Sequence, residues 1–481
     1  MSSEWSLMTL KDAGVSLIDC DHRTPAALDE GYPYIAIPQL KNGHITLDGV
    51  RRISREDYLE WTKKLKPQAN DVIVVRRCNS GQSAYVPAGL DCAIGQNLVV
   101  LRANGEYVLP EFLRWLVQGP DWWGQVSKFI NVGAVFDSLR CRDIPSFELN
   151  IPPREEQTKI AGLLGSLDDR ITLLRETNAT LEAIAQALFK SWFVDFDPVR
   201  AKAEGRARQD GERSGQPRMS LASDLPRPGA EAGAEAQGQP EAMDATTAAL
   251  FPDSFEESEL GLVPKGWRIE RAEQWLSVLE TGRRPKGGVS GILDGVPSIG
   301  AESIVRIGEF EYSKTKYVSA EFFEKMKSGA LQSHDVLLYK DGGKPGVFLP
   351  RVSMFGDGFP FEECGINEHV FRVRLKEPFS QAFLYYWLWS DAVMHELKHR
   401  GGKAAIPGIN QSDVKELRLL VPNEQILKSF DEVTKPLISR IFANSKQAQT
   451  LTQLRDTLLP RLISGQLRLP EAEILVTESM E

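Results

Sequence analysis

Two stretches of the chain carry apolar residues at alternating spacings of four and three. The first stretch places Ile160, Leu164, Leu167, Ile171, Leu174, Asn178, Leu181, Ala185, Leu188 and Trp192 on one seam. The second, less regular stretch offers Phe430, Val433, Leu437, Ile441, Asn444, Ala448, Leu451, Leu454, Leu458 and Leu462. Such heptad spacing is typical of coiled-coil helices. A helix of about 40 residues spans roughly 60 Å.

Two such helices in one chain favour pairing with each other, antiparallel, as a rigid spacer. The alternative is that each helix packs only on its own globular domain. Asn178 and Asn444 would place polar groups on the seam, which fixes register at a cost in stability. Pro436 and Pro460 should kink or end the second helix, because proline lacks the amide proton that a helix interior needs.

The remainder of each half alternates short β-rich segments with Gly, Pro and Asn turns. The predicted strands include residues 71–75, 97–102, 335–339 and 369–375. An aromatic amphipathic helix is predicted in each half, at 110–118 and 380–389. The fold class is therefore α+β, with two mixed α/β domains separated by two long helices.

The chain also repeats itself. NDVIVVRRCNSG (70–81) matches HDVLLYKDGGKP (334–345) at a shift of 264 residues. A shift of 270 aligns GQNLVVLR (95–102) with GINEHVFRVR (365–374), and NIPPREEQ (150–157) with LVPNEQ (420–425). Matches in one order at a nearly constant shift indicate a tandem duplication.

Between the halves, the chain is rich in Ala, Gly, Pro, Arg and Glu, a composition that cannot bury enough apolar area to order itself. A flexible acidic linker is predicted there. The formal net charge is −9, and residues 201–260 hold 6 Lys and Arg against 12 Asp and Glu. The rest of the chain is thus nearly neutral, which neither excludes nor announces a nucleic-acid partner.

Composition narrows the class further. Of the 481 residues, 42% are apolar and 26% are charged, as in ordinary globular proteins. The five cysteines are odd in number and contain no CxxC pair, which favours reduced thiols in a cytoplasm. No apolar run is long enough for a membrane helix, and the opening residues do not resemble a secretory signal. A cytoplasmic protein with no membrane partner is expected.

Most catalytic motifs are missing from the sequence, including a phosphate-binding GxxxxGK[ST] loop and an NPPY-type methyltransferase tetrapeptide. His395, Glu396 and His399 do spell HExxH, which on a helix can bind zinc. Glu416 is the only tempting third ligand. The aligned residues of the first half, 125–129, contain no ligand, so we expect no metal site and no catalytic residue.

Basic loops are the better functional candidates, because they recur at equivalent points in both halves. Arg, Lys and Asn bind phosphates and base edges. The predicted DNA-binding residues are Arg23, Arg76, Arg77, Asn79, Arg283, Arg284, Lys286, Lys340, Lys344, Arg400 and Lys403. The alternative for any one of them is a solvated turn that happens to be basic.

These features resemble the specificity subunit of type I restriction–modification systems. Residues 151–205, from IPPREEQTKIAGLLGSLDD onward, resemble the central region that this family shares. LFPDSFEESELGLVPKGW (250–267) resembles the entry into its second recognition domain, and LPRLISGQLRL (459–469) resembles its distal region. Only residues 206–247 match no family pattern.

The resemblance implies two target-recognition domains, each reading one half of a bipartite, asymmetric DNA sequence. The expected domains are 1–150 and 251–420 for recognition, 151–200 and 421–470 for the helical regions, 201–250 for the linker, and 471–481 for a tail. The helices would dock two modification subunits through a seam that includes Leu167, Ile171, Leu174, Leu181, Leu188, Leu437, Ile441, Leu451 and Leu458.

The same resemblance implies that the chemistry belongs to other chains. The modification subunits would methylate adenine with S-adenosylmethionine, and two restriction subunits would use ATP and Mg²⁺ to translocate and cut double-stranded DNA. This chain would bind no cofactor itself. Two other interpretations stay open, a coiled-coil scaffold without a DNA role and an HExxH zinc hydrolase.

Overall fold

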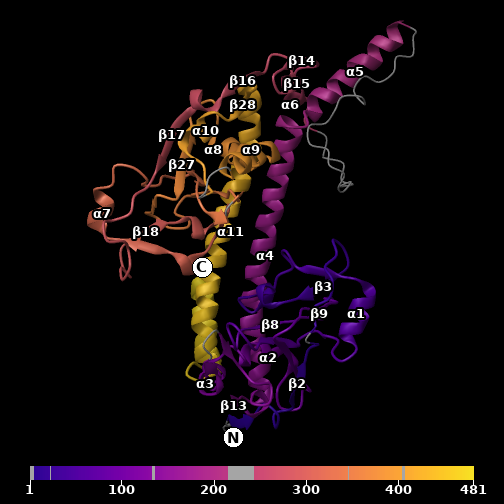
Figure 1. Cartoon of the computed structure of the whole chain (residues 1–481), viewed down its shortest axis with the longest axis vertical. Coiled ribbons are helices and arrows are strands. Elements are labelled where there is room, and N and C mark those ends of the chain that lie inside the picture. The colour runs from indigo at the N-terminus through magenta and orange to yellow at the C-terminus, as the bar shows by residue number, and fades with distance from the viewer. Residues whose placement is uncertain are drawn as a thin grey trace. The chain divides into compact units, whose positions relative to one another are not determined.

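The computed structural model describes residues 5–21, 23–132, 136–214, 243–344, 346–402 and 407–480. The chain divides into two compact units. The first contains residues 1–172 and 449–481, and the second contains residues 173–448. Each unit therefore combines one globular half with one section of each long helix, α4 (Arg154–Phe193) and α11 (Glu424–Ile463) (Figure 1).

The first unit is built on a four-stranded antiparallel sheet of order β2-β10-β7-β8. Its strands are β2 (Val15–Asp19), β10 (Leu98–Ala103), β7 (Val72–Val75) and β8 (Ser83–Tyr85). The smaller sheets comprise β6 (Arg51–Ile53), β3 (Tyr32–Ile35) and β9 (Ala93–Ile94); β4 (Leu40–Lys41) with β5 (His44–Ile45); β1 (Ser6–Thr9) with β13 (Glu148–Ile151); and β11 (Asn131–Val132) with β12 (Asp137–Ser138). Its helices are α1 (Arg55–Thr62), α2 (Pro110–Leu116), α3 (Pro120–Phe129) and α12 (Leu469–Met480).

The second unit repeats this plan. Its central sheet has the order β17-β27-β22-β25, with β17 (Leu276–Thr281), β27 (Val370–Leu375), β22 (Val336–Tyr339) and β25 (Val352–Met354). The other strands are β21 (Lys316–Val318), β18 (Val296–Ile299) and β26 (Gly365–Ile366); β19 (Ile304–Arg306) with β20 (Glu309–Phe310); β16 (Arg268–Arg271) with β28 (Arg418–Val421); β14 (Phe255–Ser258) with β15 (Gly261–Pro264); and β23 (Gly343–Lys344) with β24 (Val347–Phe348). Its helices are α5 (Asp197–Ser214), α6 (Ala245–Leu250), α7 (Ala320–Glu324), α8 (Gln381–Trp389), α9 (Asp391–Gly401) and α10 (Gln411–Lys415).

The equivalence extends to strand direction. In the first unit, β3 pairs antiparallel with β6 and parallel with β9. In the second unit, β18 pairs antiparallel with β21 and parallel with β26. Antiparallel and parallel pairing around one short strand is a specific arrangement, so its recurrence confirms the tandem duplication and the α+β class.

The two long helices pack antiparallel. Within the second unit, Asn178 of α4 donates hydrogen bonds to the carbonyl of Ile441 (3.1 Å) and to Ser445 Oγ (2.9 Å). Asn444 donates to Asn178 Oδ1 at 2.9 Å. Further along α4, Phe189 lies 5.9 Å from the ring of Phe430, which precedes those α11 residues. The predicted seam asparagines thus bond to each other, which satisfies the polar groups that a seam would otherwise leave unpaired.

Helix α11 continues through Pro436 and ends three residues after Pro460, so the prediction that Pro436 could end the helix is wrong. Pro436 lies on an exposed face, and so does Glu432, whose carbonyl loses its helical partner. Water can therefore replace the missing bond. Pro460 lies in the last turn, where few intrahelical bonds remain to be lost. The seam itself shifts, because Val433 is exposed and Thr434 is buried in its place.

The predicted flexible linker, 201–250, is helical at both of its described ends. Helix α5 extends to Ser214, through Ala, Arg and Glu residues that favour helix. Helix α6 begins after Asp244, whose carboxylate accepts hydrogen bonds from the amides of Thr246 and Thr247. Residues 215–242, the main part of that prediction, lie outside the described residues.

Candidate nucleic-acid interface

Three loops meet at one end of the central sheet in the first unit. They are the loop after β2 (residues 20–31), the loop between β7 and β8 (76–82), and the turn before β10 (95–97). Gln96 donates a hydrogen bond to Thr24 Oγ1 at 2.9 Å, and the amide of Arg76 donates to the carbonyl of Asn97 at 2.8 Å. The structure therefore brings the predicted residues Arg23 and Arg76 onto adjacent loops.

The second unit contains the same arrangement. The loop after β17 carries Arg284, which forms an ion pair with Glu368 at 3.1 Å in the turn before β27. The amide of Lys340, directly after β22, donates to the carbonyl of His369 at 3.1 Å. Gly282 donates its amide to the carbonyl of Asn367 at 3.2 Å. Three equivalent loops thus meet at the equivalent end of the second sheet.

In each unit, a buried aspartate precedes the strand that leads into a basic loop. Asp71 accepts hydrogen bonds from Arg102 of β10 at 2.7 and 2.6 Å and from the amide of Gln68 at 2.8 Å. In the second unit, Asp335 accepts from Arg372 of β27 and from the amide of Gln332. Both aspartates are almost fully buried.

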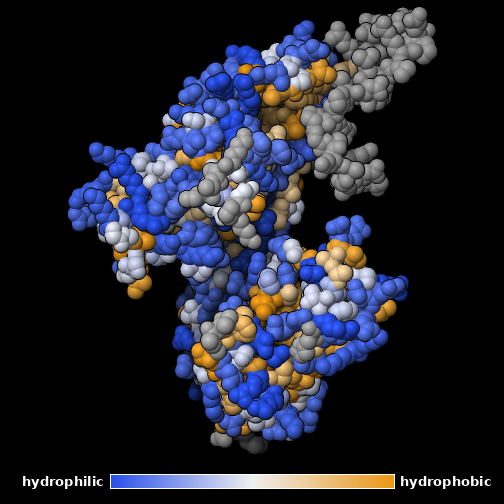
Figure 2. Space-filling view, viewed as in Figure 1, coloured by the Kyte–Doolittle hydropathy of each residue, from blue (hydrophilic) through white to orange (hydrophobic). Residues whose placement is uncertain are grey.

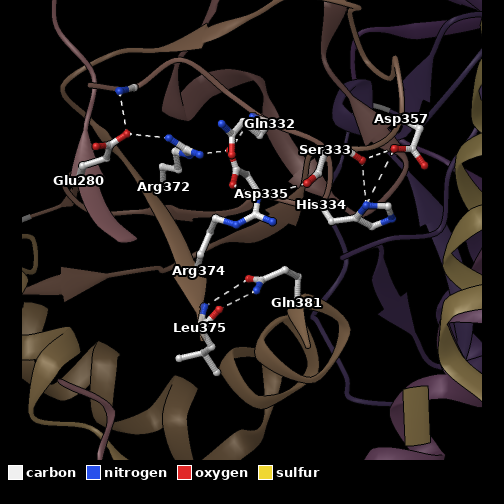
Figure 3. Close-up of polar contacts among 11 residues, drawn as sticks. Glu280, Gln332, Ser333, His334, Asp335, Asp357, Arg372, Arg374, Leu375 and Gln381 are labelled. Carbon is white, nitrogen blue, oxygen red and sulfur yellow. Dashed lines mark hydrogen bonds and ion pairs between the residues drawn. The ribbon is translucent and has the colours of Figure 1, made fainter. Parts of the chain in front are cut away.

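Figure 3 shows the second network, which also includes Arg374, bonded to Asp335 at 2.5 Å, and Glu280, bonded to Arg372 at 3.0 Å. Each aspartate immediately precedes the strand that leads into a basic loop. Buried, charge-assisted hydrogen bonds have demanding geometry, so they fix the position of that strand in its sheet.

Left-handed backbone shapes the loop after β7. Cys78 and Asn79 have φ angles of 57° and 73°, and Gly81 follows at 93°. Asn97, in the adjoining turn, has a φ of 66°. Asparagine and glycine tolerate this conformation better than most residues, so the sequence permits a tight loop here. The turn exposes the side chains of Arg77 and Asn79.

The basic residues of the first unit differ in how they are held. Arg23 forms ion pairs with Asp21 (2.6 Å) and Glu60 (3.3 Å), and its guanidinium lies 4.7 Å from the ring centre of Trp61. Its side chain is nevertheless 58% exposed. Arg76 is half-buried, and its Nε, buried from solvent, has no hydrogen-bond partner among the described residues. Arg77 and Asn79 are the more accessible pair.

In the second unit, an ionic chain links two of the predicted loops. It runs from Arg284 to Glu368, from Glu368 to His369 (3.4 Å), from His369 to Asp341 (2.6 Å), and from Asp341 to Lys340 (2.9 Å). Arg283 and Lys286 are exposed, and no ion pair in the described part of the chain involves either. Of the predicted DNA-binding residues of this unit, they are the described ones that are exposed and have no partner carboxylate within the described ranges.

Comparison with known proteins shows similarity to type I restriction specificity subunits. Residues 3–183 match the family described as the type I restriction modification DNA specificity domain. The HindI specificity subunit of Haemophilus influenzae is 29% identical over 420 residues, which cover 81% of this chain and 85% of that protein. The MjaIX specificity subunit of Methanocaldococcus jannaschii is 22% identical over 479 residues, covering 97% and 94%. This chain is therefore similar to type I restriction specificity subunits over most of its length.

Two solved structures can be aligned with nearly the whole length of this chain. The S subunit from M. genitalium has 13% identity and a TM-score of 0.47, with 96% of each chain covered. The HsdS subunit from Thermoanaerobacter tengcongensis has 17% identity and a TM-score of 0.31, with 97% of this chain and 98% of that one covered. Both alignments are loose, so the similarity to specificity subunits rests on the sequence matches.

Three other predicted basic residues, all in the second half of the chain, differ from these in their surroundings or in how far they are described. Arg400 forms ion pairs with Glu396 (2.6 Å) and Glu416 (2.9 Å) and lies 3.8 Å from Asp413, so its charge is already satisfied within the second unit. Its role as a DNA contact stays a prediction. Lys403 lies outside the described residues. Lys344 is described only by its backbone, in β23.

The same ion pairs bear on the HExxH motif. Glu396 is held by Arg400, and the exposed His395 and His399 lie on the surface of α9. No group of three or more potential ligands capable of holding a metal ion occurs within the described ranges. In the structure, Glu396 of the motif pairs with Arg400, one turn later, near the C-terminal end of α9.

The predicted seam residues are buried or half-buried within the unit to which each belongs. The first unit contains Leu167, Ile171, Leu451 and Leu458, and the second contains Leu174, Leu181, Leu188, Leu437 and Ile441. The buried members hold the helices, and Leu181, Leu188 and Leu437 remain partly accessible, so docking through this seam stays a prediction. Leu173 and Ile184 of α4 are also exposed and apolar.

Sequence reasoning missed the turns that connect the loops. Gln96, Asn367 and Glu368 bridge the basic loops, yet only the alignment of Asn97 with Asn367 hinted that these turns mattered. Asn367 lines a small surface pocket with Arg283 and Arg284. In the view of Figure 2, apolar surface residues form small groups among polar ones. No helix in the described part of the chain is long and apolar enough to cross a membrane.

Proposed function

We propose that each unit of this specificity subunit reads one half of a bipartite DNA sequence. The observation that supports the proposal is the recurrence of three linked loops with exposed cations at equivalent places in both units. Arg77 and Asn79 would contact the first half-site, and Arg283 and Lys286 the second. Arginine and lysine grip phosphates or guanine, and asparagine suits adenine.

The antiparallel helices support the second part of the proposal. They would hold the two recognition units at a set separation and dock two modification subunits, with two restriction subunits joining the assembly. Two heads on one spacer strengthen binding through effective concentration, and their separation sets the gap between half-sites. The chemistry, with S-adenosylmethionine, ATP and Mg²⁺, would belong to those partners, and this chain would contribute recognition alone.

Mapping of methylated adenines tests the proposal. The specificity subunit is coexpressed with its modification subunits, and the methylated sites are sequenced for the wild type and for two variants. R77A/N79A should relax or abolish the first half-site only, and R283A/K286A the second only. Each base contact contributes about 1–3 kcal/mol of discrimination.

Matched controls separate recognition from general charge. Lys11, exposed in the turn between β1 and β2, and Arg268, 67% exposed on β16, lie outside all of the loops. K11A and R268A should leave both half-sites unchanged. Methylation that needs no bipartite site, or loop variants whose sites match the wild type, would contradict the proposal and favour a scaffold.

A further inference from the structure

Two paired strands of the first unit, β11 and β12, contact the loop that carries Arg77; Asn131 pairs with Ser138 and Val132 with Asp137. We call this strand pair the β11–β12 hairpin, although residues 133–135, between the strands, lie outside the described residues. Ser138 forms a β-bridge with Arg77, and the amide of Cys78 donates to the carbonyl of Asp137 at 3.3 Å. The amide of Ser80 donates to the carboxylate of Asp137, also at 3.3 Å. The hairpin and the loop therefore form one structural element.

This element exposes apolar side chains beside its polar ones. Val132 is 87% exposed and Phe136 is 45% exposed, although both residue types usually lie inside proteins. A third exposed side chain, Trp123, packs against Gly81 at the end of the same loop. Exposed apolar groups gathered at one place, rather than scattered singly, mark an interaction surface.

Arg77 connects the apolar surface to the basic loop. Its guanidinium lies 5.7 Å from the ring centre of Phe136, within range of a cation–π contact. Residues 76–81 and 128–143 together contain five basic residues (Arg76, Arg77, Lys128, Arg140 and Arg142) and two acidic ones (Asp137 and Asp143). The chain as a whole is acidic, so this positive surface is local and complements a polyanion.

We infer that the β11–β12 hairpin is an apolar reading element for duplex DNA, in which Val132 and Phe136 contact thymine methyl groups of the first half-site while Arg77 holds the adjoining phosphate or base edge. The inference rests on the proposed function and deepens it. Apolar side chains discriminate thymine through its C5 methyl group. An adenine-methylating system has at least one A·T pair in each half-site, so a thymine is always present.

The chemistry of the surface favours DNA over a protein partner. A protein-docking surface has an apolar core that is depleted of charge. Here the guanidinium of Arg77 lies beside the exposed ring, Asn79 is exposed on the same loop, and Arg140 donates a hydrogen bond to Asn131 of β11 (2.8 Å). Apolar groups set among cations and amides are typical of base-edge recognition.

Deoxyuridine substitution tests the inference. Uracil lacks only the methyl group of thymine and keeps its hydrogen-bonding edge. The specificity subunit, assembled with its modification subunits, is titrated with duplexes in which each thymine of the first half-site is replaced in turn. At the contacted position, wild-type affinity should fall about fourfold, the value of burying one methyl group. The F136A complex should bind unmodified DNA more weakly by about fourfold or more and lose little further from that replacement.

Tyr107 provides the control. It is 46% exposed, matching Phe136, but it follows the opposite end of β10 from the recognition turn. Y107A should retain both the wild-type affinity and the wild-type deoxyuridine pattern, and V132S should lose affinity as F136A does, with a smaller side-chain change.

Three outcomes would overturn the inference. F136A and V132S could bind like Y107A, the deoxyuridine losses could be equal in wild type and F136A at every position, or F136A could fail to assemble with the modification subunits, which would indicate a protein contact. A wild-type complex that methylates no bipartite site would instead refute the proposed function. If R77A/N79A alters the first half-site while F136A and V132S do not, the hairpin inference alone fails.

Discussion

The two units fix their globular halves to the long helices by opposite means. In the first unit, Asp168 of α4 is buried among three cationic or ionisable partners. It accepts hydrogen bonds from Arg455 of α11 (2.6 Å), from His44 Nε2 (3.1 Å) and from Arg114 of α2. Arg114 also lies 4.0 Å from the ring centre of Tyr85. The contact is ionic and directional.

In the second unit, an aromatic cluster joins α4, α11 and α8. Phe189 and Phe193 of α4 pack against Phe430 of α11 at ring-centre distances of 5.9 and 5.2 Å. Phe383 of α8 lies 5.3 Å from Phe189 and 5.1 Å from Phe193. Trp192 extends the cluster, 6.1 Å from Phe430. These rings form part of the main hydrophobic core of the unit.

The repeat makes the difference interpretable. At the shift of 270, Asp168, Arg455 and Arg114 correspond to Ile438, Ala185 and Leu384, all of them buried. The duplication thus preserved topology and burial while the chemistry changed as a set. Physical chemistry explains why the three positions belong together, since one buried charge without its partners is far more costly than a full apolar set.

Removing the carboxylate should have the largest effect on this comparison. D168A leaves the buried guanidinium of Arg114 without its counter-ion and leaves Arg455 paired only with Asp456, so we expect a loss of about 3–5 kcal/mol of stability in the first unit. Amide hydrogen exchange in increasing urea measures it, because the method resolves which unit opens.

Two further variants decide whether charge is the cause. D169A changes the exposed neighbour of Asp168 and should leave the stability of the first unit nearly unchanged. The triple variant D168I/R114L/R455A installs the apolar set of the second unit and should recover most of the loss. A triple variant as unstable as D168A would contradict the idea that the two chemistries are interchangeable.

The aromatic contact should be less sensitive to one substitution. F430L removes ring contacts but leaves an apolar side chain, so we expect the second unit to lose about 1–3 kcal/mol. The same exchange experiment reports it. L293A, which changes a side chain that is 89% exposed in that unit, is the control. A loss larger than that of D168A would reverse the ranking of the two contacts.

Much of this organisation could be predicted from the sequence, because periodicity and repetition are local signals. The helices, their antiparallel pairing and the seam positions of Asn178 and Asn444 follow from the periodicity and the duplication, whereas the bond between the two asparagines is seen only in the structure. The ionic cluster could not be predicted. Asp168 and Arg455 are 287 residues apart, and neither stands out in a helix where charged residues are common.

The candidate site shows the same limit. The sequence locates basic residues on strand-bounded loops. It does not show that Arg400 forms an ion pair within the second unit, because its partner Glu416 is contributed by the segment that follows α10. The sequence did not point to Phe136, because a phenylalanine is usually expected in the hydrophobic core. Only the fold shows that it is exposed beside Arg77.

Acid should weaken the first unit through Asp168. Burial raises the pKa of this carboxyl, but the hydrogen bond from His44 and the charges of Arg114 and Arg455 outweigh burial and hold the pKa well below its usual range. A depressed pKa contributes stability above the unfolded value of about 3.9, and this stability is lost as the pH falls toward the folded value.

Stability of the first unit should therefore decline below about pH 4 by more than that of the second unit. Thermal unfolding and exchange across this range measure the decline, which D168N should flatten because the amide does not titrate. An equal acid slope in D168N and the wild type would assign the sensitivity to other carboxyls.

The smallest expected effect concerns the buried carboxylate of the second unit, Glu182. Burial raises its pKa and prevails over the opposing hydrogen bond from Tyr385 (2.7 Å) and the charge of Arg306. The sign is thus opposite to that of Asp168: the folded state favours the protonated form, and stability falls as the pH rises through the raised pKa. E182Q keeps an oxygen for the Tyr385 hydroxyl without a charge, so at neutral pH it should stabilise the second unit by less than about 1 kcal/mol.

That gain should shrink on acidification, when the wild-type glutamic acid is itself neutral. Exchange of second-unit amides at neutral and acidic pH measures both values, with E176Q, on an exposed position of α4, as the control. A destabilised E182Q at neutral pH would show that the charge interaction with Arg306, 4.0 Å away, outweighs desolvation. Glu182 would then stabilise α4 in the second unit as a buried anion, as Asp168 does in the first unit, and the contrast between the two helix contacts would narrow to the aromatic rings.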